Sequence, residues 1–270
     1  MDYDLTGVQE ELRDLARSFT EREVVPHAAS WDAEDVTPVE VLRKGAALGL
    51  GSLTIPERYG GGGAGLTEAV IVAEELGHGC AGFASSFTLN ELAAKAIVAG
   101  GSEEQRGTYL KRICDGTFAA YAMTEPDAGS DVAGITTRAT RDGNEYRITG
   151  SKVWITNSVM AEFLVVFAKT DVDAGRNGIS AFVVDADADA PGLEVGPRLP
   201  KLGQKASPAA EVFLNDVRVP ADRLLGAEGD GHRIAMDVFV HTRPVIAAIA
   251  VGLIRRCLHE SLEYASTRTT

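Results

Sequence analysis

Apolar residues recur every three or four positions over the first part of the chain, a spacing typical of amphipathic helices. This spacing predicts a helix over residues 5–25 that Pro26 ends, because proline breaks a helix interior. Further helices are predicted over residues 38–48, 67–77, 83–99 and 103–114. Residues 56–65 are rich in glycine, and we expect a loop there because glycine at this density destabilises a helix.

The pattern changes at Gly116, after which short β-rich runs alternate with turn signals. Strands are predicted over residues 118–123, 145–149, 163–169, 179–184 and 211–214. Helical spacing resumes at Gly231 and continues to the end of the chain. The predicted fold is α+β and multidomain: an N-terminal helical domain (1–116), a middle antiparallel β-barrel or sandwich (117–228) and the first helix of a C-terminal helical bundle (229–270).

Composition and charge limit the function classes. The 270 residues are 45% apolar, which suits one or two domains with substantial cores and excludes a disordered chain. The net charge is −13, so nucleic acid is not an expected partner. The three cysteines lie far apart, which fits a reducing compartment, and the five histidines lack the spacing of metal ligands.

The sequence predicts neither a targeting segment nor a membrane span. Residues 1–20 lack the apolar stretch of a signal peptide. The longest apolar run, residues 245–254, is followed by two arginines and is shorter than the roughly 18 residues that suggest a span. We therefore expect a soluble, cytoplasmic protein.

The segment YAMTEPDAGSDVAG at residues 121–134 is the first candidate for chemistry. A strand is expected to end at Met123, and a polar loop with Gly129, Ser130 and Asp131 follows. Such a loop offers free backbone N–H groups and a hydroxyl to an anionic or heteroaromatic ligand. On spacing alone, an ordinary β-turn explains the same residues.

The segment SKVWITN at residues 151–157 is the second candidate. Trp154 and Thr156 are two residues apart, so on a regular strand they share one face. An indole and a hydroxyl placed in this way can flank a planar ring and bond to its edge. The alternative is a core tryptophan with a surface threonine.

Taken together, these segments resemble the acyl-CoA dehydrogenase family of flavoproteins. The motifs AMTEPDAGSDVAG (122–134) and KVWITN (152–157) carry the resemblance. Supporting matches are IPERYGG (55–61), GSEEQRGTYL (101–110), FLNDVRVP (213–220) and TRP (242–244). The resemblance implies a helical domain, a middle β-domain and a C-terminal four-helix bundle, with FAD bound noncovalently against the β-domain.

The resemblance also implies which residues bind FAD. The backbone around Tyr121, Met123 and Thr124 would meet the pyrimidine edge of the flavin. Gly129 and Ser130 would approach the pyrophosphate or the thioester ligand. Trp154 would pack beside the isoalloxazine, with Ile155 next to it and Thr156 bonded near flavin N5. Arg268 and Thr270 would reach the FAD of a neighbouring subunit.

For the acyl-CoA, the resemblance implies Ser130, a loop residue near Arg176, and the segment Val240, His241, Thr242 and Arg243. Arg243 matches the family pattern. Val240 departs from it, since relatives commonly carry aspartate there. This difference puts one polar contact to the pantetheine arm in doubt, together with the choice between CoA and an acyl carrier protein.

The implied reaction is α,β-dehydrogenation of an acyl-CoA thioester, as in fatty acid metabolism: a carboxylate removes the α-proton while the β-hydrogen leaves as hydride to flavin N5. In most relatives the carboxylate lies late in the C-terminal bundle, and in a few it occupies the position of Thr242, which cannot act as that base. The base is therefore expected beyond Thr270, in a longer protein or on another subunit.

The implied partners are an electron-transfer flavoprotein and further copies of the chain, in a dimer or homotetramer. Two alternatives stay open. The same fold serves flavin oxidases and monooxygenases, which use oxygen as acceptor. In the second alternative, the chain is a non-catalytic subunit of a split dehydrogenase and supplies part of a binding site to a partner subunit.

Overall fold

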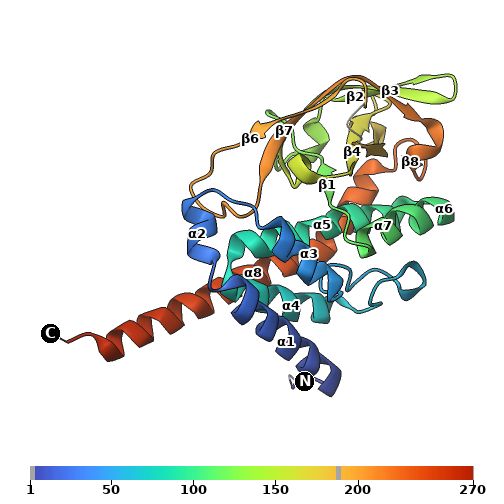
Figure 1. Ribbon diagram of the computed structural model, residues 1–270. Helices are drawn as coiled ribbons and strands as arrows, with labels where there is room; N and C mark the ends of the chain where they lie inside the picture. The colour runs from blue at the N-terminus through green and yellow to red at the C-terminus, as the bar shows by residue number, and fades with distance from the viewer. Residues whose placement is uncertain (1–3, 187–189, 270) are drawn as a thin grey trace.

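The computed structural model describes residues 4–186 and 190–269. Strands gather on one side of the molecule and most helices on the other, and a long last helix runs past both (Figure 1). The helices are α1 (Gly7–Phe19), α2 (Ala28–Ala33), α3 (Val39–Ala47), α4 (Leu66–Gly79), α5 (Ala81–Gly100), α6 (Glu103–Gln105), α7 (Lys111–Cys114) and α8 (Gly231–Thr267). The strands are β1 (Ala119–Ala122), β2 (Arg138–Asp142), β3 (Glu145–Thr156), β4 (Phe163–Lys169), β5 (Ile179–Asp185), β6 (Leu193–Arg198), β7 (Ala209–Pro220) and β8 (Leu224–Leu225).

The helix predictions are confirmed for the long elements. Helix α1 continues as a π-helical turn over Thr20–Val24, so the two together match the predicted 5–25. The prediction over 103–114 corresponds to α6, a π-helical turn and α7, and Ser102 caps α6 by accepting a hydrogen bond from the Gln105 backbone. Helix α2 was not predicted, because Pro26 marks a helix end and six residues are too few for a clear period.

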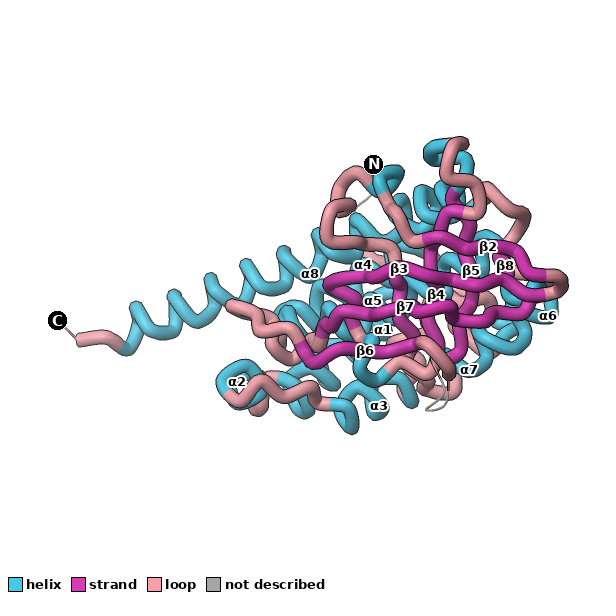
Figure 2. The backbone as a smooth tube through the Cα atoms, turned by 90° about the horizontal axis from the view of Figure 1, so that it is seen from above, coloured by secondary structure: helices cyan, strands magenta, loops and turns pink. Residues whose placement is uncertain are grey.

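The strands form one eight-stranded sheet in the order β6-β7-β3-β2-β4-β5-β8, with β1 beside β4, and the sheet lies over the helices (Figure 2). Most pairs are antiparallel, as predicted. The expectation of a purely antiparallel sheet is wrong at two places, because β1 and β2 both pair with β4 in parallel. Both come from chain crossovers, which the spacing of residues within a strand does not reveal.

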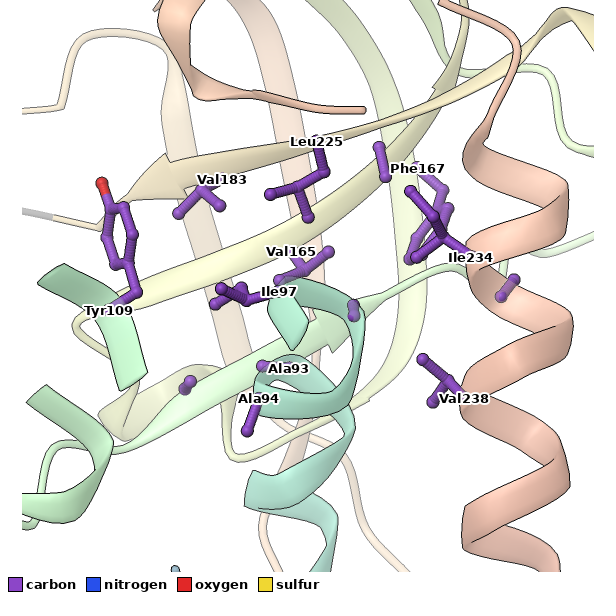
Figure 3. Close-up of a cluster of buried hydrophobic side chains, with 14 of the residues drawn as sticks. Ala93, Ala94, Ile97, Tyr109, Val165, Phe167, Val183, Leu225, Ile234 and Val238 are labelled. Carbon is purple, nitrogen blue, oxygen red and sulfur yellow. The ribbon is translucent and has the colours of Figure 1, made fainter. Parts of the chain in front are cut away.

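Strand β4 is buried on both faces, which explains its unbroken apolar sequence FLVVFAK. Phe163, Val165 and Phe167 pack with residues of α5, α7 and α8, in the core that Figure 3 shows. Leu164 and Val166 face the opposite way, into a second core with β3 and β7. Strand β4 therefore contributes to two cores: one is shared with the helices, and the other lies within the folded sheet.

Helix α8 lies against α4 at very short range. A Cβ atom on Gly77 would lie 2.5 Å from the Ile249 carbonyl oxygen, and one on Gly252 would lie 2.1 Å from that of Glu74. Only glycine allows the two backbones to approach so closely. By length and apolar composition α8 could cross a membrane, but Ile234, Val245 and Ile249 are buried in the cores of this molecule.

Candidate cofactor and thioester site

The loop that follows β1, residues 123–137, is held by one buried carboxylate. Glu125 accepts hydrogen bonds from the Thr136 backbone N–H (2.6 Å), the Thr136 hydroxyl (2.8 Å) and the Thr137 backbone N–H (3.0 Å). It also accepts one from Lys152 Nζ at 2.8 Å, and the Lys152 side chain is fully buried. Both ends of this motif loop are therefore bound to one carboxylate in the interior.

The second motif contributes the countercharge. Lys152 lies on β3 and also donates to the Met123 carbonyl oxygen at 3.2 Å. Burial by itself raises the pKa of Glu125, but the charge and hydrogen bond of Lys152, with the bonds from Thr137 and Thr136, outweigh burial and lower the pKa. Burial lowers the pKa of Lys152, against the raising effect of Glu125. Glu125 and Lys152 are 27 positions apart in the sequence, and their pair connects the two motifs, which the sequence gave no sign of.

The indole of the second motif lies outside the core. Trp154 has φ = +60°, in the left-handed region, and β3 shifts its register against β7 between Lys152 and Ile155. A bulge of this kind turns one side chain out of the ladder, and the Trp154 side chain is 54% exposed. The Val153 N–H donates to the Thr124 carbonyl oxygen at 3.0 Å, so the tryptophan emerges beside the first motif.

Asn157 fixes the end of the same strand to the helical layer. Its side-chain oxygen accepts a bond from the Ser86 hydroxyl at 2.6 Å, and its amide donates to the Ser86 carbonyl oxygen at 2.8 Å. Ser86 lies on α5, and both residues are fully buried. The sequence motif contained Asn157 without suggesting this role, because its partner is 71 positions away.

A groove of about 400 Å³ opens where β1, the motif loop, α5 and α8 meet. Most of its walls are apolar, and Arg243 is the charged side chain among them. The lining residues are Leu89, Leu92, Tyr121, Met123, Thr124, Gly129, Val132, Phe239, Thr242, Arg243 and Ile246.

Six of the predicted site residues therefore line one surface: Tyr121, Met123, Thr124, Gly129, Thr242 and Arg243. The Tyr121 ring packs against Phe167 with ring centroids 4.8 Å apart, and burial raises the pKa of its hydroxyl. The Arg243 guanidinium lies 5.5 Å from the centre of the Phe239 ring. The Thr242 hydroxyl donates to the Val238 carbonyl oxygen within its own helix.

Other predicted residues are not among those that line the groove. Ser130 is exposed on the motif loop, and Thr156 is half-buried on β3. The Ile155 side chain is buried in the core of the sheet, so a cofactor contact from this residue is left to its backbone. Arg176 is exposed in the turn Gly175–Gly178, which contacts both α8 and the turn Val132–Gly134 of the motif loop.

Arg268 lies far from the groove. It follows the last residue of α8, and the 25 positions that separate it from Arg243 correspond to roughly 37 Å along a helix. Figure 1 shows this end of α8 projecting away from the rest of the molecule. Thr270, the other residue predicted to reach a neighbouring FAD, lies outside the described residues.

A second cavity, of about 260 Å³, adjoins the groove and is called the side cavity below. It shares Leu89, Thr242 and Ile246 with the groove. The predicted residues Val240 and His241 line it, together with Thr54, Ala64, Gly65, Leu66, Ala69, Thr88, Glu91, Lys95 and Val245. Glu91 and Lys95 were missed by the sequence analysis, although two charges inside an apolar helical pattern were a usable signal.

Family models match nearly the whole chain. The N-terminal, middle and C-terminal domains of acyl-CoA dehydrogenase match residues 6–117, 120–217 and 229–270. The chain belongs to the acyl-CoA dehydrogenase family. Membership of this family therefore accounts for both the sequence motifs and the fold.

Two relatives are 38% identical to this acyl-CoA dehydrogenase family member. One is the probable medium-chain specific acyl-CoA dehydrogenase 2, mitochondrial, of Caenorhabditis briggsae, with 99% of this chain and 66% of the relative aligned. The other is the probable acyl-CoA dehydrogenase fadE25 of Mycobacterium bovis, with 98% and 68%. The chain thus spans about two thirds of the length of these relatives.

Solved structures with similar sequences have the same fold as this chain. Glutaryl-coenzyme A dehydrogenase in complex with glutaryl-CoA is 36% identical, with a TM-score of 0.96 over 100% of this chain and 69% of the other. The FAD complex of PigA is 31% identical, with a TM-score of 0.94 over 100% and 71%. The prolyl acyl carrier protein oxidase AnaB is 29% identical, with a TM-score of 0.93 over 99% and 71%.

The residues of this family member fit a flavin. The exposed indole of Trp154 follows Val153, whose N–H binds the carbonyl oxygen of Thr124 in the groove wall, and the groove is mainly apolar, which suits a flat aromatic ring. A Cβ added at Gly129 would meet no atom within 4 Å, so the motif loop leaves open space next to its backbone. Tyr121, Met123, Thr124 and Trp154 would hold the ring system, and FAD would supply the two-electron acceptor of the reaction.

Proposed function

We propose that the protein containing this chain is an FAD-dependent acyl-CoA dehydrogenase, an oxidoreductase that forms the α,β double bond of an acyl thioester. The observation that supports this proposal best is the groove, where the motif loop faces the segment Phe239–Arg243 of α8. When bound, FAD supplies the acceptor, at its N5, for the hydrogen that leaves the β-carbon as hydride. The residues of the chain have the tasks of binding, orienting and excluding water.

The apolar walls of the groove exclude water from the reacting carbons. In such surroundings, charges and hydrogen bonds act more strongly than in water, which favours loss of the weakly acidic α-proton. Arg243 carries the positive charge of the groove and is proposed to orient the polar part of the thioester. Ser130 and Arg176 are proposed to contact the CoA portion, since both are exposed, Ser130 follows Gly129 of the groove wall, and the turn that holds Arg176 contacts the motif loop and α8.

The proton acceptor is proposed to come from outside the described residues. No carboxylate occurs among the described residues that line the groove. The Thr242 hydroxyl is bonded within its helix, and its ordinary pKa is far too high for a base at neutral pH. We retain the prediction that a carboxylate from beyond Thr270, or from a partner subunit, removes the α-proton.

The partners and surroundings of the enzyme also belong to the proposal. We propose an electron-transfer flavoprotein as electron acceptor, a dimer or tetramer in which Arg268 and Thr270 serve a neighbouring FAD, and a cytoplasmic role in fatty acid metabolism. An oxidase acting on a carrier-bound acyl group is the second candidate. It is favoured by the similarity to the prolyl acyl carrier protein oxidase and by the exposed Val240.

The test is a titration of the FAD-loaded protein with butyryl-CoA, followed by flavin absorbance and by calorimetry. We expect saturable binding, and we expect Arg243→Ala to weaken it by about tenfold while flavin content stays the same, because a charge-assisted contact is lost. Arg233→Ala, at an exposed arginine nearly three turns earlier on α8, is the matched control. A butyryl-CoA affinity that does not change in Arg243→Ala would contradict this role.

Oxygen consumption separates the two candidate functions. An oxidase consumes oxygen in proportion to the substrate oxidised, without a protein acceptor. A dehydrogenase instead needs the electron-transfer flavoprotein or a dye as acceptor. Absence of FAD binding by the folded protein would contradict both functions.

A further inference from the structure

The side cavity differs from the groove in its polarity. On α5, Thr88, Glu91 and Lys95 follow one another at three- and four-residue spacing and form one polar stripe along the cavity. Leu89 and Leu92 form the neighbouring stripe, which faces the groove. An acyl chain that extends from the groove past Leu89 therefore enters the side cavity, which has charged side chains in its wall.

The charged groups of this wall have few partners. Glu91 is 8% exposed, and one of its oxygens accepts from the Thr54 hydroxyl at 3.2 Å. Within the described parts of the chain, Lys95 Nζ has one hydrogen bond, to the Thr54 carbonyl oxygen at the long distance of 3.5 Å. An ammonium group has three N–H donors, so Lys95 keeps donors for another acceptor.

Burial makes these incomplete interactions costly. Burial raises the pKa of Glu91, against the lowering effects of Lys95 and Thr54, and burial lowers the pKa of Lys95, against the raising effect of Glu91. Among the described residues, Glu91 and Lys95 act on each other through their charges, while the hydrogen bonds of both side chains go to Thr54. A hydrocarbon in this cavity would displace water from both groups and replace none of their hydrogen bonds.

We propose that the side cavity selects acyl thioesters whose distal part carries an oxygen that accepts a hydrogen bond from Lys95. A hydroxyl and a carboxylate both meet this description. This inference rests on the proposed function, because the acyl group must first be placed in the groove. The apolar part of the cavity wall, with Leu66, Val245 and Ile246, would cover the methylene groups that precede the oxygen.

The experiment compares hexanoyl-CoA, ω-hydroxyhexanoyl-CoA and adipoyl-CoA, three thioesters with the same number of acyl carbons. Dissociation constants are measured by calorimetry on the FAD-loaded full chain, so the result does not depend on turnover. We expect at least one of the two oxygen-bearing thioesters to bind about tenfold more tightly than hexanoyl-CoA. The hydroxyl and carboxylate ligands separate a neutral from an anionic acceptor.

Three variants test whether the preference depends on Lys95. Lys95→Met keeps the length of the side chain and should remove the difference between the ligands. Lys111→Met, the same substitution at an exposed lysine of α7, is the matched control and should keep it. Glu91→Gln, which preserves side-chain shape, should retain the preference for the hydroxyl compound. If a variant does not fold, the comparison of the three thioesters on the wild-type protein still tests the proposal.

Two outcomes would overturn the inference in different ways. If hexanoyl-CoA binds as tightly as both oxygen-bearing thioesters, or more tightly, the side cavity does not select for oxygen and the proposed function stands. If none of the three thioesters binds to the FAD-loaded protein, the proposed function fails, and the inference fails with it.

Discussion

At the scale of single residues, Glu125 and Lys152 connect the two sequence motifs. The carboxylate accepts bonds from the motif loop and from Lys152, and neither side chain has more than 4% of its area exposed. An ion pair this deeply buried stabilises the fold only when its hydrogen bonds are complete, and removal of one partner leaves a charge without compensation. We infer that the pair positions the loop for ligand binding.

This pair predicts how stability depends on pH. Lys152 and the threonine bonds outweigh burial and lower the pKa of Glu125 from 4.5 to about 2 in the folded protein. Because the folded pKa is lowered, the stabilisation is fully present above pH 4.5 and is lost as the pH falls toward 2. We expect Glu125→Gln to flatten the dependence of the free energy of unfolding on pH in this window, measured by urea denaturation.

The control for this variant is Glu40→Gln, at a carboxylate that is 81% exposed on α3. It should leave the pH dependence almost as it is in the wild type. An equally steep loss of stability in Glu125→Gln and wild type would show that other carboxylates cause the acid sensitivity.

Trp154 illustrates backbone strain at a candidate ligand site. A bulky residue with φ = +60° costs on the order of 1–3 kcal/mol, and the surrounding sheet must supply that energy. The bulge directs the indole outward, next to the Thr124 backbone, and leaves it 54% exposed. A strained, exposed aromatic side chain of this kind suits a surface that binds an aromatic ligand.

We expect Trp154→Ala to weaken FAD binding by roughly threefold to tenfold, because an aromatic contact contributes about 0.5–1.5 kcal/mol. The flavin absorption spectrum should shift at the same time, since the ring loses its neighbour. Val159→Ala, at an exposed apolar residue a few positions later, is the matched control. Unchanged flavin content together with an unchanged spectrum would count against this placement.

At the scale of elements, the contact between α4 and α8 depends on two glycines. Gly77 and Gly252 let each helix backbone lie against the other, and Arg255 at the next turn of α8 pairs with Glu74 and Glu75 of α4. The Glu75 carboxylate is 5% exposed and also bonds to Arg17 of α1. This cluster of charges fixes the crossing of three helices, and with it the position of the part of α8 that lines the groove.

We expect Gly252→Ala to lower the free energy of unfolding by about 1–3 kcal/mol, because a Cβ atom would overlap the Glu74 carbonyl oxygen. In an ordinary exposed helix the same substitution stabilises. Gly107→Ala is the control, at an exposed position of the π-helical turn Arg106–Leu110, where a Cβ atom would meet nothing within 4 Å and no such loss of stability is expected. A Gly252→Ala protein as stable as wild type in thermal and urea denaturation would show that the two helices can move apart without cost.

At the scale of the whole molecule, the groove exists only because the sheet and the helices meet there. Its walls come from α5, from β1 with the motif loop, and from α8, whose lining residues follow those of the other elements by more than 100 positions in sequence. The division into domains at residues 1–116, 117–228 and 229–270 stays a prediction. The core shown in Figure 3 contains side chains from all three of these ranges, so helices and sheet are packed together through a shared apolar interior.

Much of this protein followed from local patterns. Helical spacing predicted α1, α3, α4, α5 and α8, and the strands β4 and β5 were found nearly to the residue, because the period of apolar positions reflects which faces are buried. The two motifs led to the family and to the residues that meet at the groove. These properties depend on neighbours a few positions away, which a sequence displays directly.

Tertiary structure decided the rest. The parallel pairing of β1 and β2 with β4, the outward turn of Trp154, the bond between Asn157 and Ser86, and the place of Glu91 and Lys95 in the wall of the side cavity all depend on partners distant in sequence. Their energies arise from burial and from hydrogen bonds that exist only after the layers have packed. Local periodicity carries no information about which distant surface supplies the partner.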